Sequence, residues 1–434
     1  RSGMEWIIVV AVITLVAVVM VLMGVAMPRF KKMQILVDRI NLVAREILTG
    51  LPVIRAFGRE KKEEERFDDA NVVLTKNMLF TNRVMTFMMP LMMFIMYGVS
   101  ILIVWVSTDK INTGTIQVGT MTAFITYSMQ IVMAFLMITM FSVMLPRASV
   151  SAERIDEVLN TKVSIEDKPD TKANPVANGE VAFEHVSFAY PGAKENVLED
   201  ISFVAKTGQT TAIIGGTGSG KTTLVNLIPR FFDVTKGKVM VDGTDIREMS
   251  QESLREAIGY VPQKGVLFSG TIDSNLRYGK EDATKEQVMD AARIAQAKEI
   301  IDGKKDGLDS AIAQGGSNVS GGQKQRFSIA RAIVKDPKIY IFDDSFSALD
   351  YKTDAILRRE LSKKTKEAAV IIVAQRISTI LHAEQIIVLN EGKVAGIGTH
   401  QELFDHCAVY REIAESQLSE ADIAKLKAQG KEVM

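Results

Sequence analysis

The feature that most constrains this chain is an uninterrupted apolar run near its start. Residues 6–27 are all hydrophobic except Thr14 and Gly24. As a helix with a rise of about 1.5 Å per residue, the run spans roughly 33 Å, enough to cross the hydrocarbon core of a bilayer. It lacks the basic start and small-residue cleavage site of a signal peptide. It therefore predicts a transmembrane helix and argues against a soluble N-terminal half.

Two further apolar runs, about residues 84–106 and 118–145, predict two more transmembrane spans without charged side chains. Arg29 and the two lysines after it follow the first span, so the positive-inside rule places that end in the cytoplasm. The polar segment 107–117 is then external, and everything after residue 145 is cytoplasmic. We expect a multi-pass protein of the lipid bilayer, located in the plasma membrane.

The segment between the first two spans, residues 29–83, mixes apolar periodicity with charge, which is typical of helices that continue into the cytoplasm. Gly50 and Pro52 predict a helix break at residues 49–52, followed by a short apolar element that ends at Phe57. From these residues, 49–57 is either the tip of a helix hairpin or a docking element for a cytoplasmic domain.

Methionine is concentrated in the spans: 18 of the 22 methionines precede residue 150. They either fill gaps between helices or form an adaptable wall for varied apolar ligands. In both cases the spans offer no buried countercharge to a strongly ionic substrate.

Composition excludes two classes of function. Cys407 is the only cysteine, so an intrachain disulfide and a cysteine-based metal site are ruled out. The 52 basic and 52 acidic residues balance, and no charged tract is long enough to predict a nucleic-acid partner.

The polar segment 160–178 contains two prolines and predicts a linker. After it, strands alternate with helices over residues 179–414, including β-rich runs at 211–214, 339–342 and 370–373. This pattern predicts an α/β domain with a mostly parallel core sheet, placed behind an α-helical transmembrane bundle. The tail, 415–434, predicts a surface helix to which we assign no function.

A phosphate-binding loop lies between an apolar strand and a helix. It consists of Gly215, Gly216, Thr217, Gly218, Ser219, Gly220, Lys221 and Thr222, followed by Thr223. The glycines let backbone N–H groups approach phosphates, Lys221 reaches the β- and γ-phosphates, and the Thr222 hydroxyl suits Mg²⁺. The strand–loop–helix context makes ATP with Mg²⁺ the expected ligand.

A second element of the site is the apolar strand 339–342, which ends in two carboxylates. Asp343 is placed to support Mg²⁺, and Asp344 to act as the general base for an attacking water. A third element is the segment Ser320, Gly321, Gly322 and Gln323, which opens a helix. Free N–H groups and the positive end of the helix dipole make it an anion-binding corner.

With these motifs, essentially the whole chain resembles a half-transporter of the exporter class of ATP-binding cassette (ABC) proteins. Residues 319–323 resemble the family signature. The resemblance implies that Gln263 senses Mg²⁺ and contacts the membrane domain, Tyr190 stacks on adenine, and Asp350 belongs to the D-loop. It implies a P-loop core with a helical subdomain. It also matches residues 49–57 to the second coupling helix, which favours the docking interpretation.

Three departures from the family pattern matter. Such half-transporters have six spans, whereas this sequence starts at what resembles the fourth and without an initiator Met; we expect an N-terminally incomplete chain. The family has Glu where this chain has Asp344, which is one methylene shorter. The family's switch histidine is Gln375, which can donate a hydrogen bond to the γ-phosphate but cannot take up a proton.

The last two departures together resemble the degenerate site of heterodimeric bacterial exporters. In that arrangement this chain's own site hydrolyses ATP slowly, and its signature completes the active site of a second, non-identical half-transporter. The expected function is ATP-driven export of small hydrophobic or amphipathic compounds. The alternatives are a homodimeric lipid or peptide exporter with a working Asp344, and an ATP-gated channel.

Overall fold

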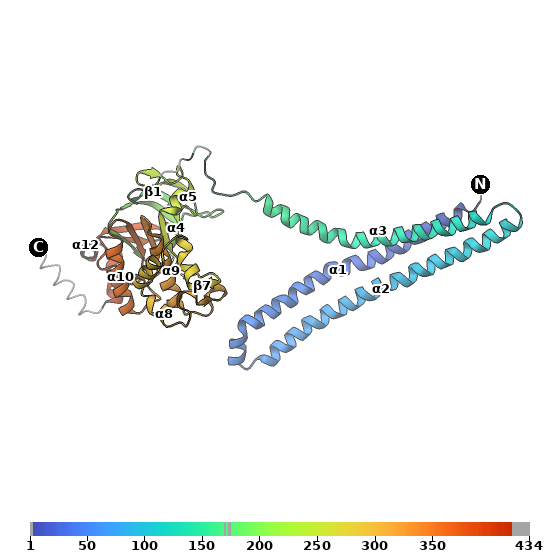
Figure 1. Cartoon of the computed structure of the whole chain (residues 1–434), viewed down its shortest axis with the longest axis horizontal. Helices are drawn as coiled ribbons and strands as arrows, with labels where there is room; N and C mark the ends of the chain where they lie inside the picture. The colour runs from blue at the N-terminus through green and yellow to red at the C-terminus, as the bar shows by residue number, and fades with distance from the viewer. Residues whose placement is uncertain (1–2, 169–170, 172–174, 419–434) are drawn as a thin grey trace. The chain divides into compact units, whose positions relative to one another are not determined.

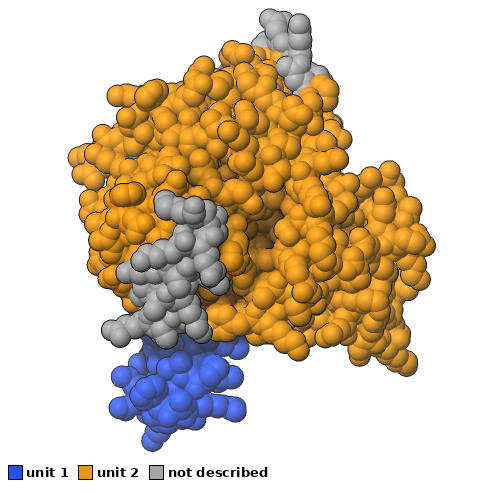
Figure 2. All heavy atoms as spheres, turned by 90° about the vertical axis from the view of Figure 1, so that its left-hand side faces the viewer, with its two compact units in different colours: residues 1–162 blue, residues 163–434 orange. Residues whose placement is uncertain are grey.

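The computed structural model of the chain describes residues 3–168, 171 and 175–418. The chain forms two compact units, residues 1–162 and 163–434 (Figure 2). The first, which we call the helical unit, consists of three long helices, and the second, the α/β unit, contains the sheets (Figure 1).

The helical unit is built from α1 (Glu5–Ala56), α2 (Glu60–Asn112) and α3 (Val118–Leu159), which are 52, 53 and 42 residues long. The connections between them are short, so each helix turns back along the preceding one (Figure 1). All three contain a stretch long and apolar enough to cross a membrane, within Glu5–Ala56, Glu60–Asn112 and Val118–Ile138. The predicted runs 6–27 and 84–106 lie within the first two of these stretches, and the third stretch ends at Ile138, before the predicted end at 145.

The three helices contact one another along narrow seams. One buried cluster takes Leu15, Met92 and Val132 from the three helices. Only 17%, 11% and 11% of the three apolar windows is buried within this chain. Met92 fills the seam, whereas Met133 and Met137 are 58% and 60% exposed. Apolar surface of this extent requires lipid or another protein segment around it.

Two expectations for the helical unit are wrong. The helix does not break at residues 49–52, because α1 continues through Pro52 to Ala56. A proline removes one helical hydrogen bond, and its fixed φ is itself a helical value, so a long helix tolerates it near its end. The loop expected at 107–117 is also shorter, since α2 continues to Asn112 and Ser107 is fully buried, donating to the sulfur of Met4.

The α/β unit has a six-stranded core sheet in the order β12-β11-β3-β10-β9-β6. All strands are parallel except β12, which is antiparallel to β11. Every residue of β9 and β10 is buried, as in parallel sheets covered by helices on both faces. The strands are β3 (Thr210–Gly215), β6 (Ile258–Val261), β9 (Ile339–Asp343), β10 (Ala369–Val373), β11 (Gln385–Asn390) and β12 (Lys393–Gly398). The predicted strands and the mostly parallel sheet are confirmed.

A second, antiparallel sheet has the order β2-β1-β4-β5, and β7 pairs with β8 in a small ribbon. Phe183 and Phe203 are cross-strand partners whose rings stack with centroids 4.6 Å apart. The strands are β1 (Val181–Phe188), β2 (Leu198–Ala205), β4 (Lys236–Val241), β5 (Thr244–Asp245), β7 (Gly270–Thr271) and β8 (Ala311–Ile312).

Helices cover the core sheet and form a helical subdomain around α9. Several begin with a capping box, in which Ser or Thr and a polar residue three positions later satisfy the first free N–H groups; these are α6, α7, α9 and α12. The helices are α4 (Lys221–Leu227), α5 (Gln251–Glu256), α6 (Ile272–Leu276), α7 (Lys285–Ile294), α8 (Lys298–Asp302), α9 (Gly321–Lys335), α10 (Tyr351–Lys364), α11 (Ile377–Ile380), α12 (His400–His406) and α13 (Ala408–Gln417). Short 3₁₀ turns lie at η1 (Arg277–Gly279), η2 (Gly307–Asp309) and η3 (Gln314–Gly316).

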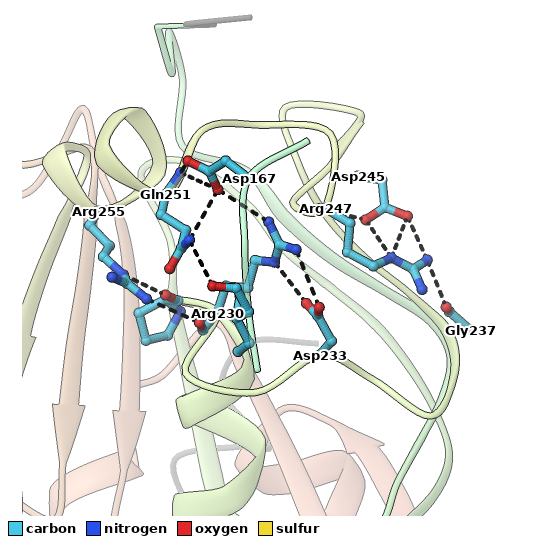
Figure 3. Close-up of polar contacts among 10 residues, drawn as sticks. Asp167, Arg230, Asp233, Gly237, Asp245, Arg247, Gln251 and Arg255 are labelled. Carbon is cyan, nitrogen blue, oxygen red and sulfur yellow. Dashed lines mark hydrogen bonds and ion pairs between the residues drawn. The ribbon is translucent and has the colours of Figure 1, made fainter. Parts of the chain in front are cut away.

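The linker predicted at 160–178 is attached to the α/β unit through Asp167 (Figure 3). Its carboxylate accepts the backbone N–H of Gln251 at the start of α5 (3.0 Å) and lies 3.6 Å from Arg230. The Arg230 side chain is 4% exposed and also pairs with Asp233 (2.7 Å). The free tether between the units is therefore shorter than the polar segment.

At the C-terminal end, α13 continues to Gln417 and so extends beyond residue 414, the boundary predicted for the domain. Tyr410 and Ala414 of α13 are fully buried in the core. Residues 419–434, most of the predicted tail helix, lie outside the described residues.

Candidate nucleotide site

Four of the predicted site segments gather at one edge of the core sheet. The P-loop follows β3, the two carboxylates follow β9, Gln375 follows β10 and Gln263 follows β6. These strands are parallel neighbours, with Val373 opposite both Ile213 and Asp343. Their carboxyl ends therefore meet, as at the ligand-binding edge of open α/β sheets.

The P-loop turns sharply into α4 at Gly220, which has a φ of +95° and caps the helix. A Cβ there would lie 2.7 Å from the Leu198 side chain, so the position requires glycine. The Lys221 ammonium donates to the carbonyls of Gly215 (2.9 Å) and Gly216 (2.7 Å). Burial lowers the pKa of Lys221, an effect that the carboxylates of Asp344 and Asp343 oppose.

The predicted magnesium ligands Thr222 and Asp343 lie together. The Thr222 hydroxyl donates to the Asp343 carboxylate at 3.1 Å. Asp343 is 2% exposed, and burial raises the pKa of its carboxyl group while the Thr222 hydroxyl lowers it. The described residues contain no group of three or more His, Cys, Asp or Glu side chains that could hold a metal by itself. Magnesium commonly uses one or two protein oxygens and takes its other ligands from substrate phosphates and water, so this pair fits the ion.

Asp344 is held by two amide side chains. One of its carboxylate oxygens accepts from Gln375 (2.7 Å) and from Gln263 (3.2 Å). Its backbone has a φ of +46°, and its N–H donates to the carbonyl of Val373 (3.0 Å). Burial raises the pKa of Asp344, although the hydrogen bond from Gln263 opposes this. The structure thus places the other two predicted catalytic residues, Gln375 and Gln263, in contact with Asp344.

Tyr190 also lies at the P-loop helix, because its hydroxyl is 3.0 Å from the hydroxyl of Thr223 on α4. Its ring packs edge-on against Phe188 and Phe232, with centroid distances of 5.0 and 5.2 Å. These contacts position the aromatic ring beside the loop that we expect to hold the phosphates.

The signature segment is not brought to this chain's own P-loop. Within residues 175–418 we find no hydrogen bond or ion pair joining residues 320–323 to residues 215–223. The Ser320 hydroxyl accepts the N–H of Gln323 (3.3 Å) and caps α9. Asp350 caps α10 by accepting the N–H of Thr353 (3.0 Å), and this backbone contact lowers its pKa.

Two contacts near the site involve residues that the sequence motifs did not predict. The fully buried Ser345 donates to the Val261 carbonyl (3.0 Å) and so joins the ends of β6 and β9. Tyr260 donates to Asn226 on α4 (2.9 Å), and burial raises its pKa to about 12. No local pattern marks these residues, since their partners are far away in sequence.

Known protein families match both units of the chain. A family model described as ABC transporter matches residues 198–347, and one described as ABC transporter transmembrane region matches residues 3–135. An ABC transporter ATP-binding protein of Mycobacterium tuberculosis is 44% identical over 98% of this chain and 73% of its own length. An ATP-dependent lipid A-core flippase of Desulfotalea psychrophila is 35% identical over 84% of this chain and 63% of its own length.

Among solved structures, a bacterial Atm1-family ABC exporter with ATP bound superimposes with a TM-score of 0.82 and 29% identity, covering 95% of this chain and 72% of that one. The chain belongs to the ABC transporter family, with a membrane domain fused to an ATPase domain in the Atm1-family exporter fold. It is an ATP-hydrolysing, membrane-spanning exporter with a cytoplasmic ATPase domain.

Proposed function

We propose that this chain is one subunit of a heterodimeric exporter and that its own ATP site is degenerate. The P-loop, Asp343 and Tyr190 bind ATP, but hydrolysis there is slow. The signature, residues 320–323, completes a competent site on a non-identical half-transporter. Two ATP molecules then bring the ATPase domains together, and ATP hydrolysis with product release resets the transporter.

The observation that carries this proposal is the contact between Gln375 and Asp344. A general base must lie within hydrogen-bond reach of the water that it activates, and an aspartate reaches one methylene less far than the family's glutamate. The oxygen of Asp344 already accepts from two amides, Gln375 and Gln263. An amide at position 375 donates a hydrogen bond but takes up no proton, so neither residue matches the usual hydrolytic pair.

The residues that bind ATP keep their expected chemistry. Backbone N–H groups of the P-loop donate to the phosphates, and Lys221 adds a positive charge. The Thr222 hydroxyl and the Asp343 carboxylate would hold Mg²⁺, and Gln263 contacts the neighbouring Asp344. When bound, the ion neutralises phosphate charge that develops during hydrolysis. This chain therefore retains nucleotide binding although its general base is weak.

For the substrate we propose small hydrophobic or amphipathic compounds. The spans are uncharged, and exposed methionines such as Met133 and Met137 offer a polarizable surface that adapts to varied shapes. Relatives bear the names ATP-dependent lipid A-core flippase and, in Bacillus subtilis, a multidrug export protein that is 37% identical over 85% of this chain. The flippase favours the alternative function, lipid export, which a homodimer of this chain could also carry out.

The test is a pair of substitutions in the natively assembled complex, purified through a tag on this chain. With Asp344→Asn, ATP turnover should stay within about twofold of the wild-type rate, because the working base belongs to the partner. With Ser320→Arg, turnover should fall by at least about tenfold, because the arginine blocks the phosphate-binding corner of the competent site.

Collapse of turnover to background with Asp344→Asn would show that Asp344 is the working base and would overturn the degenerate-site proposal. Mass spectrometry of the same complex gives an independent check, since a heterodimer contains a second half-transporter sequence in equal amount. ATP-dependent ion conductance without transport would instead support the channel alternative.

A further inference from the structure

The backbone around Gln375 is held by a side chain from the last described helix. The side-chain oxygen Oε1 of Gln417 accepts the N–H of Ile377 at 2.9 Å. The side-chain nitrogen Nε2 of Gln417 donates to the backbone carbonyl of Gln375 at 2.8 Å. Residues 374–377, which we call the switch segment, lead from the end of β10 into α11. One side chain of α13 thus bridges residues 375 and 377 of this segment.

This bridge replaces a helix cap. The four-residue helix α11 has no side-chain cap from Arg376, its own N-cap residue. The first N–H groups of a helix need acceptors from outside it, and Gln417 supplies one for Ile377. On the other side, Arg376 donates to the carbonyl of Ser347 (3.2 Å), so the segment is held from two directions.

The helix that carries Gln417 is firmly anchored, whereas Gln417 itself is exposed. Tyr410 and Ala414 are fully buried in the core of the α/β unit. The Tyr410 hydroxyl lies 2.7 Å from a ring nitrogen of His400, which ties α13 to α12. The bridge therefore transmits the position of a fixed helix to the backbone of Gln375.

We propose that Gln417 is a positioning residue for the switch segment 374–377. Its two hydrogen bonds hold the Gln375 backbone where the Gln375 amide meets Asp344 at 2.7 Å. Gln417 acts through Gln375 and touches no nucleotide itself. It connects the C-terminal helix to the ATP site, and this inference rests on the role proposed for Gln375.

The test measures ATP binding at this chain's own site by photolabelling with 8-azido-ATP in the full complex, resolving the two subunits on a gel. Gln375→Ala and Gln417→Met should each raise the half-saturating ATP concentration by about threefold to tenfold, the loss expected for one or two hydrogen bonds. The double variant should be no worse than either single one, because both changes act on the same contact.

Two further variants separate positioning from general damage. Gln401→Met makes the same chemical change on α12, where the Gln401 amide donates to Asp405 (2.9 Å), and should label like the wild type. Gln417→Glu keeps an acceptor for Ile377 but places a carboxylate against the Gln375 carbonyl, so it should be as harmful as Gln417→Met. Thermal unfolding of the Gln375 and Gln417 variants should match the wild type, since both side chains are exposed.

Wild-type labelling by Gln417→Met together with weakened labelling by Gln375→Ala would overturn this inference and leave the proposed site intact. Wild-type labelling by Gln375→Ala would overturn this inference together with the role proposed for Gln375 at the ATP site. Additive losses in the double variant, or wild-type behaviour of Gln417→Glu, would show that the bridge does not act through Gln375.

Discussion

At the scale of single residues, the site includes a glycine whose backbone packs so closely against a neighbouring strand that no side chain fits. The end of β3 passes so near β11 that a Cβ on Gly215 would lie 2.1 Å from the carbonyl oxygen of Leu389. The next residue, Gly216, has open space, because no atom lies within 4 Å of the place where a Cβ on Gly216 would be. Two adjacent glycines of one motif therefore have different structural roles.

We predict that Gly215→Ala lowers the free energy of unfolding of the ATPase domain by about 2–3 kcal/mol, because the methyl group meets backbone that cannot move alone. Gly216→Ala should leave stability within about 0.5 kcal/mol of the wild type. Thermal unfolding of the full chain in detergent measures both. Equal unfolding midpoints for the two variants would contradict the close approach of β3 and β11.

At the scale of elements, the attachment of the linker combines a buried cation with a helix terminus. Asp167 lies next to the N-terminal end of α5, where a negative charge interacts favourably with the helix dipole, and it faces the buried Arg230 (Figure 3). Arg230 keeps Asp233 as a second partner, so its charge stays compensated if Asp167 is removed. Residues 163–168 thus belong structurally to the ATPase domain.

Removing this attachment should free the linker without unfolding the domain. We predict that Asp167→Ala costs about 1 kcal/mol, since Asp167 is partly exposed, and speeds tryptic cleavage of the segment 160–168 about fivefold. Glu166→Ala, which removes the neighbouring exposed carboxylate, is the matched control. Cleavage as slow as in the wild type, measured by gel electrophoresis of the intact protein, would show that Asp167 does not hold the linker.

At the scale of the whole molecule, transport requires the ATPase cycle to move the membrane helices. The turn between α1 and α2 exposes apolar side chains at its tip: Phe57 is 76% exposed and Val53 is 61% exposed. Exposed aromatic residues at such positions commonly anchor protein interfaces. The residues 49–57, although helical to Ala56, therefore remain our proposed docking element for an ATPase domain.

We predict that Phe57→Ser lowers substrate-stimulated ATP turnover and transport by about tenfold, because an interface loses its anchor, while basal turnover stays within about twofold. Leu48→Ser changes a side chain of similar exposure, 75%, at an earlier position on α1. This variant should transport substrate and hydrolyse ATP like the wild type. Transport into inverted vesicles and ATPase assays on the same preparation separate the two effects. An equal loss in basal turnover would indicate damage to folding rather than to coupling.

The sequence by itself determined the elements that have a local signature. Apolar runs long enough for a bilayer predicted the three membrane-crossing helices, and buried β-rich runs predicted β3, β9 and β10. The P-loop and the pair Asp343–Asp344 were recognisable because their chemistry needs particular residues at short, fixed spacing. The expected helix break at Pro52 failed, because the fixed φ of proline is itself a helical value and a helix already formed loses only one hydrogen bond there.

Only the tertiary structure decided which distant residues meet. Asp344 contacts Gln375 and Gln263, 31 and 81 positions away, and Gln417 reaches Ile377 across 40 positions. Asp167 reaches Gln251 across 84 positions. Such pairs leave no periodicity in the sequence, because their distance is set by how parallel strands line up and how terminal helices pack. The sequence determined which chemical groups are present, and the fold decided which of them share a hydrogen bond.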